Sequence, residues 1–293
     1  MTAPGYRGRL APSPTGPLHF GSLVTAVASY LEARAQNGQW LVRIEDLDPL
    51  RESPEDAGQI LYSLARHQLH WDGDVRYQSS RLDLYRQLAD RLVARGRAYY
   101  CGCSRKELKA NGGHHPRHCR SRGTSPPDRP AAIRFALDHE NARWHDRILG
   151  DQHQSVRAEL DDPVIIRKEG FVAYQLAVMV DDIDQGITDV VRGSDLLETT
   201  AQQRQICQAL NGTPPGWAHI PVVLNDQGQK LSKQNQAAAL DDSQPGRNLW
   251  YALSSLGQRP PQALRGDSPE RILAWAREHW ALKYIPLQHT REP

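Results

Sequence analysis

Long apolar runs are missing from this sequence, and cysteines are few. The longest apolar stretch, residues 171–180, covers roughly half of the ~20 residues that a membrane helix needs. The first residues contain no apolar signal region, which disfavours secretion. Four cysteines among 293 residues do not make a disulfide scaffold and fit a reducing compartment better. We therefore expect a cytoplasmic protein with no membrane-spanning segment.

Internal repeats and low-complexity tracts are also absent. Apolar residues make up 39% of the chain and charged residues 24%, so a packed core is expected and wholesale disorder is not. The length of 293 residues fits about two domains, because a typical domain has roughly 100–200 residues.

The net charge is only +2, but the charges are unevenly distributed. Residues 101–129 contain seven Lys or Arg and two Asp or Glu, whereas residues 161–198 contain three and nine. A basic module of this kind fits a polyanionic partner. Charge alone leaves open the alternative of a solvated surface loop.

Strand and helix patterns alternate through the first part of the chain. We expect strands at 8–11, 39–45, 188–193 and 220–224, and helices that begin at Ser22, Ser53 and Ser268 or run through Leu84, Leu88 and Leu92. Strand, crossover helix and strand in succession predict a parallel sheet with ligands at the carboxyl ends of its strands.

This order predicts an α/β fold in four parts. Residues 1–98 and 188–240 form the two halves of a Rossmann-type sheet domain. Residues 99–187 interrupt the rhythm with cysteines, basic residues and Pro/Gly/Ser clusters, and are predicted to be an inserted module. Residues 241–293 have a helical pattern and form a short C-terminal region.

A rigid segment over residues 12–22 joins the first strand to the first helix. It is dense in proline and cannot lie inside a helix. Gly21 allows close approach of a ligand to the backbone, and the amides at the start of the following helix favour an anion. His19 adds a donor for a phosphate oxygen. In this setting the segment predicts a phosphate-binding site.

Two lysines lie three residues apart in a glycine-containing loop, Lys230 and Lys233. The chain has only six lysines, so their pairing here is notable. Ammonium groups of this kind can neutralise a transferring phosphoryl group. Taken alone, the segment is more simply an exposed loop.

The inserted segment contains a cluster of metal-binding residue types. It holds three cysteines and three histidines: Cys101, Cys103, His114, His115, His118 and Cys119. Three thiols and one imidazole suit a closed tetrahedral zinc site. The pattern does not decide which histidine takes part, and free cysteines in a basic loop are the alternative.

The two phosphate motifs together resemble the signature elements of class I aminoacyl-tRNA synthetases of the glutamyl branch. Residues 19–22 (His-Phe-Gly-Ser) match the first element and residues 230–234 (Lys-Leu-Ser-Lys-Gln) the second, each divergent at its last position. Further blocks of this branch match residues 9–16, 43–46, 180–182 and 191–193. The resemblance covers about residues 7–240 and implies a class I catalytic domain with a zinc-containing, acceptor-binding-like insertion and a stem-contact-like C-terminal region.

The resemblance also implies the roles of individual residues. Glutamate is bound by Arg9, Ala11, Ser13, Glu45, Tyr174 and Arg192; ATP by His19, Gly21, Ser22 and Lys233; the catalytic residues are His19, Gly21, Lys230 and Lys233; and structural Zn²⁺ is held by Cys101, Cys103, His115 and Cys119. Mg²⁺ is expected to accompany ATP. Two guanidinium groups, Arg9 and Arg192, suit the two carboxylates of L-glutamate, and Glu45 suits its ammonium group. The alternative is a structural ion pair between Glu45 and Arg43 or Arg9.

One departure from the family narrows the prediction. The sequence ends 60 residues after Lys233, where ordinary glutamyl enzymes continue into anticodon-binding domains. It therefore resembles a truncated branch that activates glutamate without tRNA and attaches it to queuosine at the wobble position of tRNA(Asp). The expected partner is the anticodon stem-loop of tRNA(Asp), and the expected state is a monomer.

Two other interpretations stay open. A glutamyl-tRNA synthetase without its anticodon domain would charge the terminal ribose. A non-catalytic tRNA-binding or zinc-dependent regulatory module would have no chemical need for His19, Gly21, Glu45, Arg192 and Lys233, which argues against it.

Overall fold

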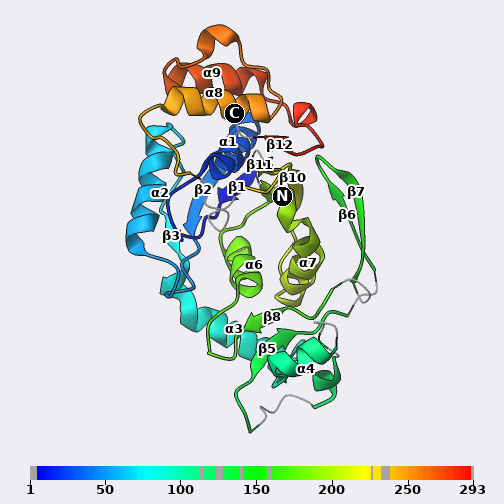
Figure 1. Cartoon of the computed structure of the whole chain (residues 1–293). Coiled ribbons are helices and arrows are strands. Elements are labelled where there is room, and N and C mark those ends of the chain that lie inside the picture. Colours follow the sequence, from blue (N-terminus) through cyan, green and yellow to red (C-terminus); the bar gives the residue numbers. More distant parts are fainter. Residues whose placement is uncertain are drawn as a thin grey trace.

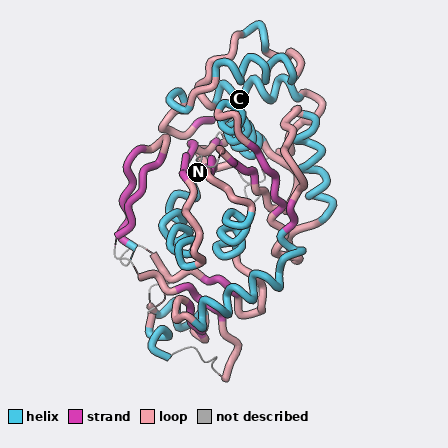
Figure 2. The backbone as a smooth tube through the Cα atoms, turned by 180° about the vertical axis from the view of Figure 1, so that it is seen from behind, coloured by secondary structure: helices cyan, strands magenta, loops and turns pink. Residues whose placement is uncertain are grey.

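The computed structural model describes residues 5–111, 115, 117–122, 128–138, 141–156, 160–225, 227–231 and 238–291. Its body is a mainly parallel sheet with helices packed around it, flanked at one end by the last helices and at the other by a small antiparallel sheet (Figures 1 and 2). The expected α/β architecture is therefore confirmed.

The main sheet consists of two halves and is parallel except for one edge strand. One half has the strand order β1 (Arg7–Leu10), β2 (Gln39–Ile44) and β3 (Arg76–Tyr77). The other has the order β7 (Gly150–Ser155), β6 (Asn141–Asp146), β10 (Gly216–Ile220) and β9 (Asp189–Gly193), and β7 is the edge strand that pairs antiparallel with β6. The halves meet where the amide of Thr188 donates to the carbonyl oxygen of Arg7 at 2.9 Å. This junction brings the carboxyl ends of β1 and β9 together.

Helices connect and cover these strands. They are α1 (Phe20–Ala35), α2 (Pro54–Arg66), α3 (Leu82–Ala94), α6 (Tyr174–Asp184), α7 (Thr200–Ala209), α8 (Pro245–Ser255) and α9 (Pro269–His279). Short 3₁₀ turns are η1 (Gln78–Arg81), η2 (His118–Arg122), η3 (Ser194–Thr199), η5 (Gln262–Leu264) and η6 (Leu282–Tyr284). One buried cluster joins α1 to the first half-sheet and to α8 and α9, and a second surrounds α3, α6 and α7.

The segment between α3 and α6 contributes to two different sheets. The strands β4 (Ala98–Cys101), β5 (Ala132–Phe135) and β8 (Val164–Ile166) form an antiparallel sheet beside α4 (Arg105–Ala110). The β6–β7 hairpin instead extends the main sheet, because β6 pairs with β10 at Asp146 and Trp217 (Figure 1). The division at residues 99–187 and the other boundaries stay predictions.

Two helix starts follow their sequence signals, and one does not. Ser53 and Ser268 cap α2 and α9 as predicted, each accepting a hydrogen bond from a backbone amide. The prediction of Ser22 as the cap of α1 was wrong. The helix begins at Phe20, and the imidazole of His19 accepts from the Ser22 amide instead.

The strand predicted over 220–224 is divided. β10 ends at Ile220, and β11 (Val223–Leu224) pairs with β12 (Thr290–Arg291). Pro221 has no amide hydrogen to continue a ladder, so the chain changes direction there. Within the described residues, no helix is both long and apolar enough to cross a membrane.

Candidate active site and metal centre

A cavity of about 490 Å³ opens at the carboxyl ends of β1 and β9. Nine of the predicted site residues line it: Arg9, Ala11, Ser13, His19, Gly21, Ser22, Tyr174, Arg192 and Lys230. The sheet thus brings together residues up to 221 positions apart, as expected for the switch point of a parallel sheet. Glu45 is not among the residues that line the cavity, and Lys233 lies outside the described residues.

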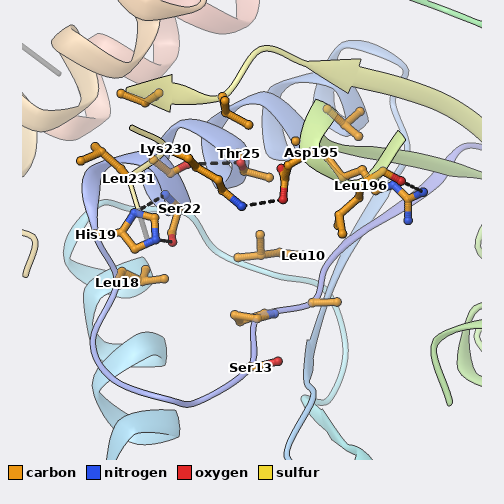
Figure 3. A pocket seen from close by; sticks show the side chains of 18 of the residues that line it. Leu10, Ser13, Leu18, His19, Ser22, Thr25, Asp195, Leu196, Lys230 and Leu231 are labelled. Atoms are coloured by element: carbon orange, nitrogen blue, oxygen red, sulfur yellow. Dashed lines mark hydrogen bonds and ion pairs between the residues drawn. The ribbon is translucent and has the colours of Figure 1, made fainter. Parts of the chain in front are cut away.

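One end of the cavity is formed by the start of α1. The Nδ1 atom of His19 accepts from the Ser22 amide at 3.2 Å, so the ring proton is on Nε2, 3.0 Å from the Ser22 hydroxyl oxygen. Figure 3 shows the imidazole beside this first helical turn. The positive end of the helix dipole, the imidazole and the Ser22 hydroxyl therefore meet at the cavity wall, an arrangement that suits phosphate oxygens.

Gly21 keeps this end open. A Cβ atom at this position would lie 3.3 Å from the His19 ring and 3.7 Å from the Leu231 side chain. The two motifs found in the sequence are thus packed against each other across a glycine. A larger residue would press directly on the imidazole.

The loop after β11 is shaped by its own backbone. The side-chain oxygen of Asn225 accepts a hydrogen bond from the backbone amide of Gln229. The backbone amide of Asn225 donates in turn to the carbonyl oxygen of Gln229 at 2.8 Å. Gly228 adopts a φ of +74°, a left-handed conformation that glycine tolerates without strain. The turn delivers Lys230 and Leu231 to the cavity.

Lys230 is drawn toward an acidic partner that the sequence did not indicate. Its Nζ atom lies 2.5 Å from the Asp195 carboxylate, which also lines the cavity (Figure 3). Asp195 lies in η3, directly after the block at residues 191–193, and this position is the only sequence signal for it. The pair provides a cation that an incoming polyphosphate can attract away from the carboxylate.

The other end of the cavity contains a buried guanidinium group. Arg192 is 3% exposed and donates to the Nε2 atom of His219 at 3.0 Å and to the Gln203 side chain at 2.6 Å. Burial lowers the pKa of Arg192 to about 10. A buried arginine in a polar cavity is a strong site for an organic carboxylate.

A second arginine, Arg9, is neutralised within the protein. Its guanidinium forms a two-pronged contact with Asp182 at 3.1 and 3.2 Å, and Asp182 also pairs with Arg43 at 2.7 Å. Glu45 pairs with Arg43 at 3.1 Å, which is the structural ion pair considered from the sequence. Burial raises the pKa of Glu45. The predicted role of Glu45 toward an ammonium group stays a prediction.

Tyr174 lies near the charges of Arg9, Arg192 and Glu45. It begins α6 and lines the cavity. Burial, and then the nearby Glu45 carboxylate, raise the pKa of its phenol, so that the hydroxyl stays protonated and can donate a hydrogen bond.

The predicted metal ligands form one buried group away from this cavity. Ligand atoms of Cys101, Cys103, His115 and Cys119 all lie within 4.8 Å of one another. The Nε2 atom of His115 is 3.1 Å from the Cys101 sulfur, and Cys103 and Cys119 are 3.5 Å apart. His118 approaches Cys103 at 3.6 Å, whereas the residue before His115 lies outside the described residues.

The chemistry of this group fits a divalent cation. Burial opposes ionisation of Cys101, but the hydrogen bonds from His115 and from the Cys103 backbone, together with the charges of His115 and Arg134, outweigh it and lower the pKa of the thiol. Burial and the neighbouring sulfur atoms raise the pKa of Cys103. Several thiolates in one buried site need a positive charge, and three sulfurs with one imidazole are a tetrahedral donor set.

Known proteins match the chain along most of its length. Residues 6–248 match the family described as tRNA synthetases class I (E and Q), catalytic domain. A protein named glutamyl-Q tRNA(Asp) synthetase from Pectobacterium atrosepticum is 45% identical over 283 residues, 97% of this chain and 87% of that protein. One of the same name from Salmonella typhi is 44% identical over 293 residues, 100% and 98% of the two chains. A crystal structure of a glutamate tRNA ligase from Elizabethkingia meningosepticum in complex with its amino acid superposes with a TM-score of 0.82 at 24% identity, covering 98% of this chain and 67% of that chain.

Proposed function

The chain belongs to the class I tRNA synthetases for glutamate and glutamine and is a ligase, and on that premise we propose the reaction that it performs. It activates L-glutamate with ATP in the absence of tRNA. It then transfers the glutamyl group from glutamyl-AMP to a hydroxyl group of queuosine at the wobble position of tRNA(Asp), forming an ester and releasing AMP. The proposal places the protein in the cytoplasm, where tRNA and ATP occur together, acting as a monomer.

The observation that carries the proposal is a single cavity with a carboxylate site at one end and a phosphate site at the other. Arg192 supplies a buried cation for a carboxylate of glutamate, while the start of α1 and Lys230 face the expected position of ATP. The relatives named glutamyl-Q tRNA(Asp) synthetase, at 44–45% identity, support queuosine as the acceptor.

The activation step is a displacement at phosphorus. The α-carboxylate of glutamate attacks the α-phosphate of ATP, a new C–O–P linkage forms, and pyrophosphate leaves in line with the attack. Such reactions depend on the positioning of the reactants and on the stabilisation of developing negative charge. Arg192 therefore orients the glutamate carboxylate, and His19 and the two lysines bind phosphate oxygens. Mg²⁺ supplied with ATP adds counter-charge. Zn²⁺ bound by Cys101, Cys103, His115 and Cys119 would stabilise the antiparallel sheet, a structural role that requires no open coordination position.

The first test is pyrophosphate exchange. With glutamate and ATP alone, labelled pyrophosphate is expected to enter ATP. Exchange that begins only when tRNA is added would contradict tRNA-independent activation.

The second test locates the transferred glutamate. Radiolabelled glutamate is expected on tRNA(Asp) that contains queuosine and to be absent from the same tRNA made without it. Nuclease mapping and mild base treatment then place the label on the wobble base or on the 3′ ribose. Equal labelling of the unmodified transcript at its 3′ end would identify an ordinary glutamyl-tRNA synthetase instead.

A further inference from the structure

Arg192 is oriented by uncharged groups alone. Besides His219 and Gln203, its guanidinium donates to the hydroxyl oxygen of Thr200 at 3.0 Å and to the carbonyl oxygen of Leu196 at 3.1 Å. Across the described part of the chain it forms no ion pair with a carboxylate. Its charge is therefore fixed in direction without being neutralised, in contrast to that of Arg9.

The contact with His219 determines where the imidazole carries its proton. His219 is fully buried, and its Nε2 atom accepts from the Nε–H of Arg192. The ring proton must then be on Nδ1, which lies 2.6 Å from an oxygen of Asp146. The carboxylate thus selects the tautomer that can accept from the arginine.

Asp146 is itself firmly held. Its other carboxylate oxygen accepts from the backbone amides of Ile148, Leu149 and His219 at 2.9–3.2 Å. It is the last residue of β6, which pairs with β10 at this point. The two oxygens therefore have distinct partners, and the side chain cannot exchange them freely.

The packing around Arg192 completes the arrangement. Its guanidinium lies over the Trp217 ring, 4.3 Å from the ring centroid, and the Trp217 and His219 rings are nearly parallel. An aromatic face and a neutral imidazole both favour a cation without cancelling it.

We propose that Asp146 and His219 are positioning residues that hold Arg192 in the orientation and charge state needed to bind a carboxylate of glutamate. This inference rests on the proposed function, because it takes glutamate as the ligand of the cavity. A carboxylate bound directly to Arg192 would orient it equally well but would neutralise it. The imidazole of His219, between Asp146 and Arg192, fixes the orientation of the guanidinium and leaves its positive charge free to bind the glutamate carboxylate.

The decisive variant is Asp146→Asn. The three backbone amides hold the carbonyl oxygen of the new amide in place, so its NH₂ group faces His219 Nδ1. The ring proton of His219 then moves to Nε2, where it faces the Nε–H of Arg192, and the acceptor for that N–H is lost. In pyrophosphate exchange, the KM for glutamate is expected to rise about tenfold or more, while the KM for ATP and the kcat change much less.

The chain offers a matched control on the same hairpin. His145 and Asp151 form a similar pair, with Nδ1 and the carboxylate oxygen 2.8 Å apart, but both side chains are exposed. Asp151→Asn is expected to leave both KM values at those of the wild type.

Two substitutions of His219 test the same contact from the other side. The amide oxygen of His219→Gln can replace Nε2 as the acceptor for Arg192, whereas His219→Leu has none. The glutamine variant is expected to retain a KM for glutamate several-fold lower than the leucine variant. The two variants keep the test available even if Asp146→Asn fails to fold.

The results separate this inference from the proposed function. Exchange by the wild type with glutamate tests the function, and its absence would remove the basis of both. If the wild type is active, an unchanged KM for glutamate in Asp146→Asn overturns only the positioning role. Equal effects of glutamine and leucine at His219, or a parallel rise in the KM for ATP, would also overturn it.

Discussion

Of the two lysines predicted to bind phosphate, Lys230 lies among the described residues and Lys233 does not. Lys230 contacts Asp195, whereas Lys233 has its role from the sequence alone. Lys233→Ala is expected to slow glutamate activation by about 100- to 1,000-fold, because its ammonium is predicted to bind charge that develops in the transition state. Steady-state exchange kinetics will separate this from binding, since the KM for glutamate should change little.

A suitable control for that variant is Lys283→Ala. Lys283 lies in η6 over the ring of Tyr284, in the C-terminal region. Its exchange rate should match that of the wild type. If Lys233→Ala weakened glutamate binding as strongly as it slowed the reaction, the lysine would be a ground-state contact instead.

A buried histidine between two helices predicts a pH dependence of stability. His67 caps α2, its Nδ1 atom lies 2.7 Å from the Ser63 carbonyl oxygen, and its Nε2 accepts from Asn248 of α8 at 3.1 Å. Burial lowers the pKa of His67 below 6.5, outweighing Asp242, which lies 3.9 Å away, while Arg66 adds to the lowering. In acid, His67 therefore binds a proton more readily in the unfolded chain than in the folded protein. The protein loses stability as the pH falls through the pKa that the histidine has in the unfolded chain.

Urea unfolding at about pH 7.5 and about pH 5.5 measures this effect. Between these two pH values, the free energy of unfolding of the wild type is expected to fall by more than that of His67→Gln. A constant difference between the two proteins would show that the histidine does not titrate differently in the folded state.

At the scale of elements, the contact between α8 and α9 depends on a glycine. A Cβ atom at Gly246 would lie 1.8 Å from the carbonyl oxygen of Asp267, a backbone atom that cannot move aside alone. Gly246→Ala is therefore expected to destabilise the protein by about 1–3 kcal/mol, as overpacking does. Thermal or urea unfolding measures the change.

The same substitution on α2 should act in the opposite direction. Gly58 lies within this helix, and a Cβ atom there meets nothing within 4 Å. Gly58→Ala is expected to stabilise the protein by about 0.4–1 kcal/mol, through helix propensity and a less flexible unfolded chain. Equal effects of the two alanines would contradict the packing argument at Gly246.

Helix starts could be predicted from the sequence where residues a few positions apart determine them. Ser53 and Ser268 act through amides three residues away, so their caps could be identified from spacing. The cap of α1 was missed because an imidazole is an uncommon cap. Asp146 and His219 were missed for another reason: they are 73 residues apart, and only the pairing of β6 with β10 brings them together.

For the whole molecule, the metal group and the cavity lie in different parts of the fold. Removal of the metal by a chelator is expected to increase hydrogen exchange in β4 and η2, which carry Cys101 and Cys119, and to leave α1 and α8 protected. Elemental analysis should find one zinc per chain in the wild type and none in the double variant with Cys101→Ser and Cys119→Ser.

Cys207→Ser is the control for the metal. Cys207 is buried in α7, outside the ligand group, so this variant should retain its zinc. Full zinc content in the double variant would disprove the assignment, and loss of protection throughout the fold would show that the metal supports more than the antiparallel sheet.

The position of β6 constrains how this protein can be recombined with its relatives. A chimera that exchanges residues 99–187 would also exchange residue 146 and, with it, the partner of His219. Crossover points that keep residues 141–155 with their own main sheet avoid this. RNA preference and amino-acid preference should then be transferable separately, and libraries built at those crossover points should contain more active clones than libraries that exchange the whole segment.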